Sequence, residues 1–202
     1  MEVKEFRFLN IVDECDEKYE AWSRIYEYPY VIDTLKKLGA TPESLIHNTS
    51  WGYSGCHVTF KEDLDAAYPG TLHSDIRPSN LPNTMYYDIT QPIADEFKGA
   101  FDFVLNISTV EEVPFNNIQI IKNLLEQVRV GGHLVLTFDV ADGDYMADGN
   151  GSMNVAAVED FVNSKINEYE RIPHIRGSLS QLPNPRWSHL RVGVLVIQKT
   201  AP

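Results

Sequence analysis

Cysteine is scarce in this chain of 202 residues, and no apolar run approaches the length of a membrane-spanning helix. The two cysteines, Cys15 and Cys56, are too few for the disulfide framework of a secreted scaffold and favour a reducing compartment, so we expect a cytoplasmic protein. A spanning helix needs ~18 apolar residues, so we also expect no membrane partner. The opening segment, MEVKEFRFLN, contains acidic residues and no apolar core, which predicts no signal peptide.

Basic residues are also few, with 17 lysines and arginines against 29 acids and a formal net charge of -12. A surface of this sign repels a phosphate backbone, so we expect no nucleic-acid partner. The charge is uneven, because residues 171–202 hold five bases and no acid, whereas residues 139–160 hold six acids and no base. Two interpretations follow: the basic segment packs against the acidic body, or it binds an anion.

A catalytic triad and a metal-ligand cluster are both missing from the motifs. The acidic loop 142–151 lacks the spacing of a calcium-binding EF-hand, and a lid over a substrate is the better interpretation. His47 and His57 flank a loop that also contains Cys56, but a third metal ligand is not apparent. We therefore expect a buried thiol at Cys56 and no bound metal.

Hydrophobic residues make up 43% of the chain and charged residues 23%, the proportions of an ordinary globular protein. Short apolar runs, typical of buried strands, alternate with stretches of helical spacing. The segments expected as strands are 44–48, 71–74, 85–87, 101–105, 133–138, 166–172 and 190–199, and those expected as helices are 13–27, 29–38, 59–67, 115–130 and 154–164. This alternation predicts an α/β fold with a mainly parallel sheet and helices on both faces.

Particular residues set three helix boundaries. Tyr28-Pro29 is expected to separate the first two helices, because the residue before a proline avoids the helical region. Thr59 and Glu62 form a capping-box pattern that starts the next helix at Thr59. The helix over 115–130 is expected to end at Gly131-Gly132. Its buried face is expected to carry Ile118, Ile121, Leu125 and Val128.

Polar residues follow five of the expected strands at the point where each strand ends. They are Asn48, Asp75, Asp88, Asn106 and Asp139. In open parallel sheets ligands bind outside the carboxyl ends of the strands, so these residues predict one shared ligand site. The alternative is that they only cap the helices that follow.

The segment after the first of these strands resembles the first motif of class I S-adenosylmethionine-dependent methyltransferases. In that family an acid and spaced glycines follow the strand. Here Asn48 stands at the acidic position, Ser50 at the first glycine and Gly52 at the second, while Tyr53 and Gly55 continue the loop. Gly55 lies one residue beyond the family's third glycine. The departures at Asn48 and Ser50 would weaken cofactor binding, because serine adopts a positive φ less readily than glycine.

Later segments continue the resemblance in the same order. Asp75, followed by Ile76, matches the acid that holds the ribose hydroxyls of the cofactor, and a carboxylate can accept both hydrogen bonds of a diol. Asp88-Ile89 resembles the pair that meets the adenine ring. The segment 101–104 resembles the opening of the fourth strand, and the segment 106–113, which begins with Asn106, resembles the stretch that follows it. The segment 130–136 resembles the turn into the fifth strand.

The resemblance implies a Rossmann-like methyltransferase fold, with residues 1–40 as an N-terminal helical cap and residues 41–202 as the S-adenosylmethionine-binding domain. It implies transfer of a methyl group from S-adenosylmethionine to an acceptor, which we expect to be a small molecule. Related enzymes often build a lid from the segment that here contains Arg24, Tyr26, Glu27, Tyr28 and Tyr30, and the alternative for the tyrosines is a place in the helix core. One alternative is a catalytically silent binding or regulatory module with the same fold. An NAD-binding Rossmann enzyme is disfavoured, because no G-x-G-x-x-G follows the first strand.

Glu111 and Glu112 follow the fourth of these strands, where the resemblance places the methyl group and its acceptor. Adjacent residues of a regular helix or strand do not face the same pocket. We therefore expect Glu112 to point into the site, as an ion-pair partner or a general base. Glu111 is expected to be solvated or to cap the next helix. Both are the candidate catalytic residues.

Overall fold

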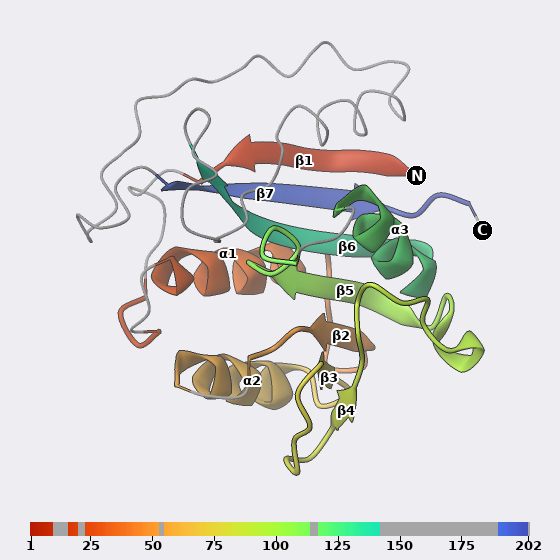
Figure 1. Ribbon diagram of the computed structural model, residues 1–202, viewed down its shortest axis with the longest axis horizontal. Helices are drawn as coiled ribbons and strands as arrows, with labels where there is room; N and C mark the ends of the chain where they lie inside the picture. The colour runs from red at the N-terminus through yellow and green to blue at the C-terminus, as the bar shows by residue number, and fades with distance from the viewer. Residues whose placement is uncertain (10–15, 20–22, 53–54, 114–116, 142–189, 202) are drawn as a thin grey trace.

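The computed structural model of the protein describes residues 1–9, 16–19, 23–52, 55–113, 117–141 and 190–201. Several expectations fall outside these residues, namely the helix at 154–164, the strand at 166–172, the loop 142–151, most of the basic segment, and Tyr53. The described residues form one sheet with helices packed on it (Figure 1).

Seven strands make up the sheet, in the order β1-β7-β6-β5-β2-β3-β4. Their bounds are β1 Glu2–Phe8, β2 Ile46–Thr49, β3 Leu72–Asp75, β4 Thr84–Tyr86, β5 Phe101–Ile107, β6 Val128–Ala141 and β7 Leu190–Gln198. The pairs β2–β3, β2–β5, β3–β4 and β5–β6 are parallel, and only β7 runs antiparallel to its two neighbours. The expectation of a mainly parallel sheet is confirmed.

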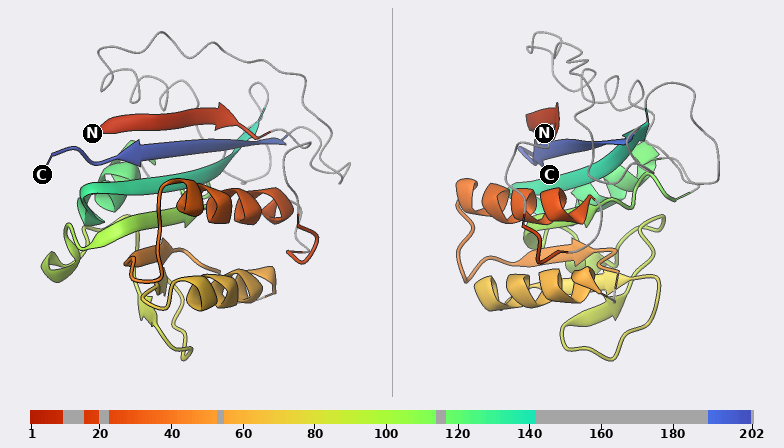
Figure 2. Two further views of the ribbon diagram at one scale, coloured as in Figure 1. Left: turned by 180° about the vertical axis from the view of Figure 1, so that it is seen from behind. Right: turned by 90° about the vertical axis from the view of Figure 1, so that its left-hand side faces the viewer.

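Helices cover both faces of this sheet, as expected (Figure 2). Helices α1 (Arg24–Lys37) and α2 (Cys56–Ala67) pack on one face, and α3 (Asn117–Gln127) packs on the other. A short 3-10 helix, η1, spans Asp95–Phe97. Within the described part of the chain, no helix has the length and apolarity to cross a membrane.

The break expected at Tyr28-Pro29 is wrong, because Pro29 lies inside α1. A proline in a helix removes one backbone donor, which leaves a carbonyl of the preceding turn without its helical partner. That carbonyl belongs to Ile25, and it accepts a hydrogen bond from the backbone N–H of Asp16 at 2.9 Å. A contact from a distant segment thus satisfies the group that the proline leaves open. The described residues 16–19 form a turn rather than part of the helix expected over 13–27.

Two further boundaries differ from expectation. Helix α2 begins at Cys56, after Gly55, so Thr59 lies inside the helix and does not cap it. Helix α3 ends at Gln127, and Val128 already begins β6. Gly132 lies in that strand, where an added Cβ would come within 2.5 Å of the Asp102 carbonyl oxygen. The fully buried apolar residues of α3 are Ile120, Ile121 and Leu124, whereas Ile118 and Leu125 are only partly buried.

Strand β1 was not expected from the sequence, and it places residues 2–8 at an edge of the sheet. Val3 and Phe6 are both buried although they are three residues apart, which simple alternation does not allow. An irregularity in the pairing between Val3 and Glu5 explains the spacing, because a bulge shifts the alternation by one residue. The first 40 residues are therefore not wholly helical, and the division at residue 40 stays a prediction.

Candidate functional site

A cavity of about 560 Å³ opens where the carboxyl ends of β2, β3 and β5 meet. From β2 the chain passes through α2 to β3 and β4 on one side, and then returns to β5 on the other side of β2. Such a reversal of strand order leaves a crevice between the diverging connections. The lining comprises Arg24, Tyr28, Asn48, Ser50, Trp51, Gly52, His57, Phe60, Asp75, Ile76, Arg77, Asp88, Ile89, Thr90, Ile107, Ser108, Thr109, Glu112 and Val113.

The loop after β2 forms one wall of the cavity. Ser50 and Gly52 both have positive φ, at 55° and 66°, so the left-handed conformation expected for a glycine is held here by a serine. A Cβ at Gly52 would lie 2.9 Å from Cδ2 of His57, so only glycine fits against this ring. The Asn48 side chain is buried, and its Nδ2 lies 3.2 Å from Nδ1 of His73.

Asp75 ends β3 and orders the floor of the same loop. Its Oδ2 accepts a hydrogen bond from the Gly52 N–H at 3.2 Å, and its Oδ1 accepts two from Arg77, through the backbone N–H at 2.9 Å and Nε at 3.2 Å. A carboxylate offers about four lone-pair positions, and these bonds use three of them. Asp75 therefore keeps acceptor capacity on the oxygen nearest the glycine loop.

Asp88 and Ile89 follow β4 and line the cavity next to this wall. Oδ1 of Asp88 accepts hydrogen bonds from the backbone N–H and the hydroxyl of Thr90, at 2.9 and 2.7 Å. Among the described residues, Oδ2 has no such bond. Ile89 is buried, and its carbonyl accepts a hydrogen bond from Asn123 of α3 at 3.1 Å.

The end of β5 supplies the opposite wall. Ser108 has a φ of 41°, an uncommon value that sits in the cavity lining. Glu112 is exposed and lines the cavity, whereas Glu111 is buried and does not. Asn106 is buried beneath the lining, where its Nδ2 donates to the Thr49 hydroxyl at 2.9 Å.

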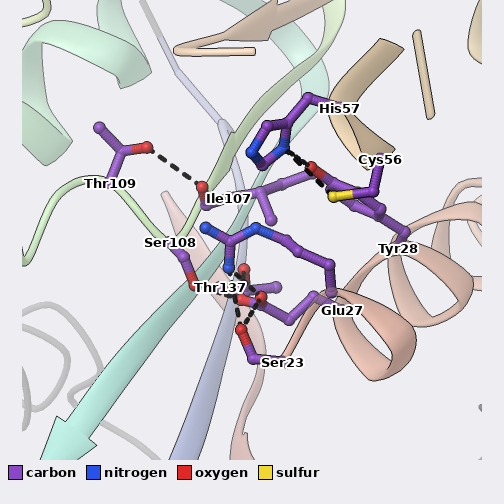
Figure 3. Close-up of polar contacts among 10 residues, drawn as sticks. Ser23, Glu27, Tyr28, Cys56, His57, Ile107, Ser108, Thr109 and Thr137 are labelled. Carbon is purple, nitrogen blue, oxygen red and sulfur yellow. Dashed lines mark hydrogen bonds and ion pairs between the residues drawn. The ribbon is translucent and has the colours of Figure 1, made fainter. Parts of the chain in front are cut away.

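Helix α1 is joined to this wall through a buried carboxylate (Figure 3). Glu27 is fully buried and accepts hydrogen bonds from the hydroxyls of Ser23 at 2.7 Å, Ser108 at 2.5 Å and Thr137 at 2.5 Å. It also pairs with the Arg24 guanidinium. Burial raises the pKa of the Glu27 carboxyl, but Arg24 and the three hydroxyl donors outweigh burial and lower it. The start of α1 is thereby fixed over the ends of β5 and β6.

The first turn of α2 contributes His57, which meets α1 at Tyr28. The Tyr28 hydroxyl is hydrogen-bonded to Nδ1 of His57, and Sγ of Cys56 lies 4.0 Å from the same nitrogen. Burial and the nearby Arg24 charge lower the pKa of His57 to about 4. Cys56 is half-buried, and burial raises the pKa of its thiol. Within the described residues, no group of three side chains is arranged to hold a metal ion.

The structure brings most of the expected cofactor residues into one cavity. Those in its lining are Asn48, Ser50, Gly52, Asp75, Ile76, Asp88 and Ile89. Gly55 and Asn106 lie outside the lining, and Tyr53 is outside the described residues. His57 and Phe60 of α2 were not expected to line the site. His57 carried one signal, because it stands beside the loop after the first parallel strand.

No protein-family model matches the chain, and no curated protein matches it. Several solved structures are similar to it in fold. The [4+2]-cyclase SpnF has a TM-score of 0.58 at 10% identity, over 87% of this chain and 82% of that one. The 1,6-didemethyltoxoflavin-N1-methyltransferase of Burkholderia thailandensis has a TM-score of 0.55 at 11% identity, over 95% and 86%. The CMeT domain of the citrinin polyketide synthase has a TM-score of 0.55 at 13% identity over 86% of this chain, which spans about half (52%) of that one.

At these identities the likeness is one of fold. It extends over 86% to 95% of this chain in these three structures. The chain therefore has the Rossmann-like fold of the class I S-adenosylmethionine-dependent methyltransferases.

Proposed function

We propose that this chain is a methyltransferase that moves a methyl group from S-adenosylmethionine to a small-molecule acceptor. The observation that carries the proposal is the position of two carboxylates, Asp75 and Asp88, at successive strand ends in one cavity beside the Gly52 loop. The volume, about 560 Å³, lies in the usual range for small-molecule sites. The solved B. thailandensis methyltransferase with the same fold was crystallised with S-adenosylhomocysteine.

The residues present fit this cofactor at its nucleoside end. Asp75 keeps acceptor capacity on Oδ2 for a ribose hydroxyl, beside the backbone N–H of Gly52. Asp88 keeps Oδ2 for an exocyclic amine, while Ile89 supplies an apolar surface for a flat ring. These contacts would hold adenosine across the carboxyl ends of β2, β3 and β4.

The chemistry asks little of the protein beyond position. The cofactor supplies a methyl group that is already activated on a sulfonium, so the chain must align an acceptor and exclude water. Glu112 is the candidate for a general base or an ion-pair partner, because it lines the cavity on the β5 side. Buried Glu111, which was paired with it as a candidate, is better placed for a structural role.

The charge of the chain supports a small acceptor rather than a nucleic acid. We expect no salt-sensitive binding to random single- or double-stranded DNA or RNA at physiological ionic strength. Micromolar binding that weakens steeply with salt would contradict this. The two cysteines remain the reason for proposing a reducing, cytoplasmic location.

The direct test is calorimetry with S-adenosylhomocysteine. Asp75→Ala should weaken binding by about 1.5–3 kcal/mol, the range for a lost hydrogen bond to a charged group. Asp95→Ala is the matched control, because Asp95 is an exposed carboxylate of η1 outside the cavity lining. Absence of binding to the wild-type protein at millimolar ligand would refute the proposal, and equal affinity of Asp75→Ala and wild type would remove Asp75 from the site.

A silent binding or regulatory module with this fold is the second candidate. It is favoured by Asn48, which stands where the resemblance has an acid and whose amide lies beside His73. SpnF, named as a cyclase, also shows that this fold is not limited to methyl transfer. Radiolabelled methyl transfer to a panel of small acceptors separates the two candidates. Binding of S-adenosylhomocysteine without transfer to any member of the panel would favour the module.

A further inference from the structure

His57 has one ring nitrogen committed to neighbouring side chains and one that is not. Nδ1 faces Tyr28 and Cys56 (Figure 3), while Nε2 has no hydrogen bond to any residue that the structure describes. The ring also lines the cavity. Nε2 is therefore the atom through which this side chain can meet a ligand.

The ring is held in one orientation from two sides. Its Cδ2 edge packs against Gly52, where even a Cβ would come within 2.9 Å. Its other side meets the Tyr28 ring edge to face, with ring centroids 6.1 Å apart and an interplanar angle of 79°. A side chain that rotated freely could not select a ligand, whereas a ring fixed in this way presents Nε2 in a constant direction.

The neighbours of Tyr28 decide which nitrogen of His57 carries the proton. Tyr28 is buried, and the hydrogen bond of its hydroxyl is with Nδ1 of His57. The phenol proton is then left to donate to Nδ1 of His57, and the opposite arrangement would leave a buried O–H without an acceptor. Burial raises the pKa of Tyr28, so the phenol stays protonated. The neutral imidazole accordingly carries its proton on Nε2.

His57 stands where two walls of the cavity meet. Its Nδ1 is bonded to Tyr28 of α1, and Glu27 of the same helix is bonded to Ser108 after β5 and to Thr137 of β6. Its Cδ2 edge packs against Gly52, in the loop after β2. The two carboxylates proposed for adenosine follow β3 and β4, on the side of β2 away from β5. His57 therefore joins the loop beside the adenosine site to the wall formed by α1 and β5.

We propose that His57 positions the methyl acceptor by donating a hydrogen bond from Nε2–H to an oxygen lone pair of that acceptor, with Tyr28 fixing the tautomer. His57 then binds acceptors that carry a carboxylate, carbonyl or hydroxyl oxygen, and an acceptor that offers only an ammonium group makes no hydrogen bond to it. This inference rests on the proposed function and deepens it, because it names the acceptor chemistry.

The test uses the whole protein labelled with ¹⁵N-histidine, and nitrogen-15 NMR to read the tautomer. We expect a protonated Nε2 and an unprotonated Nδ1 for His57 at neutral pH, identified by the absence of its signals in His57→Leu. His133→Gln is the control, since His133 does not line the cavity. Tyr28→Phe should shift the tautomer of His57, and Tyr68→Phe, which removes a hydroxyl outside the cavity, should not.

Small probes then test the ligand chemistry in protein saturated with S-adenosylhomocysteine. Acetate, benzoate or phenol should move the His57 Nε2–H signal, and benzylamine should not. His57→Gln, whose amide N–H can donate in place of the ring, should keep probe binding within a few-fold of wild type, and His57→Leu should lose it.

Three results would overturn the proposal: a proton on Nδ1, no shift with any of the oxygen probes, or a tenfold or greater loss of S-adenosylhomocysteine affinity in His57→Leu. The last would assign His57 to the cofactor. Failure of the wild-type protein to bind S-adenosylhomocysteine would refute the proposed function instead, because the tautomer of His57 is measured without that ligand.

Discussion

The buried carboxylate of Glu27 gives the sharpest test of how α1 is held against the sheet. It is fully buried and serves as acceptor for Arg24 and for hydroxyls from three different segments, those of Ser23, Ser108 and Thr137. Glu27→Gln keeps the shape and one carbonyl oxygen but removes the charge. The Arg24 side chain, only 11% exposed, then loses its ion pair with Glu27.

Breaking a buried ion pair by removing one partner typically costs about 3–5 kcal/mol, and the retained carbonyl places Glu27→Gln near the lower end, at about 3 kcal/mol. Urea unfolding followed by circular dichroism measures this loss. Asp33→Asn is the matched control on the same helix. It removes a carboxylate from an exposed pair with Lys37, so its effect should stay within about 0.5 kcal/mol.

A double variant separates the charge from the hydrogen bonds. Arg24→Met/Glu27→Gln removes both charges of this buried pair, so the double variant should be more stable than Glu27→Gln alone by about 1 kcal/mol or more. The wild-type contribution should also be lost at acid pH. The lowered pKa of Glu27 means that its contribution is present above the unfolded pKa and disappears as the pH falls through the folded one. A Glu27→Gln protein within 1 kcal/mol of wild type would refute this account of α1.

Three further variants test single features of the site and the core. Burial lowers the pKa of His47 to about 4, so between pH 6.5 and 4 the unfolded chain binds a proton that the folded chain does not. His47→Gln should therefore flatten the pH dependence of the unfolding free energy in that range by about 1.4 kcal/mol per pH unit, and an unchanged slope would contradict the lowered pKa. Ser50→Gly should raise the free energy of unfolding by up to about 1 kcal/mol in urea unfolding, because relief of the left-handed backbone outweighs the added entropy of the unfolded chain. A loss of stability would show that the serine is not strained. Gly52→Ala should weaken S-adenosylhomocysteine binding at least tenfold in calorimetry, because the added Cβ clashes with His57. Gly39 has a φ of 83° and open space around it, so Gly39→Ala carries the backbone penalty alone and should bind the ligand with wild-type affinity.

The residues of the cavity could be predicted from the sequence where a local pattern, such as the end of a parallel strand, determines their position. Asp75 and Asp88 end short apolar runs, and parallel strands carry their carboxyl ends to one edge, so period and order alone bring them together. Glu27 could not be found in this way, because its acceptor role depends on Ser108 and Thr137, which lie 81 and 110 residues away.

The errors in the fold have the same origin. Pro29 breaks a helix in isolation, but here the exposed carbonyl of Ile25 is satisfied by Asp16. The bulge in β1 breaks the alternation of its two buried residues, and the bulge is seen only in the pairing with β7. In each case a contact between segments overrode a local propensity, and that contact has no signature in the residues nearby.

Glu111 and Glu112 are the subject of the last prediction, because the structure distinguishes their burial and the sequence does not. Glu112 is exposed and lines the cavity, and its backbone N–H closes a turn onto the Thr109 carbonyl at 3.0 Å. Glu111 is buried beside it. Glu112→Gln should leave the unfolding free energy within about 0.5 kcal/mol of wild type, as for other exposed positions. Glu111→Gln should lower it by about 1–3 kcal/mol, because the glutamine amide brings two N–H donors to a buried position, and a buried donor without an acceptor costs about that much.

Turnover should show the reverse order once an acceptor has been found by the methyl-transfer panel. A general base contributes about 10²–10⁴-fold, so Glu112→Gln should lose at least a hundredfold if Glu112 removes a proton from the acceptor. Affinity for S-adenosylhomocysteine should stay at the wild-type value, because Glu112 stands on the β5 wall and not beside Asp75 or Asp88. The pH profile distinguishes its two possible roles: a base gives a rate that rises with pH and becomes flat in the variant, whereas an ion-pair partner raises KM for a cationic acceptor at every pH. Turnover equal to wild type from pH 6 to 9 would exclude both roles and leave Glu112 as one more surface acid on an acidic protein.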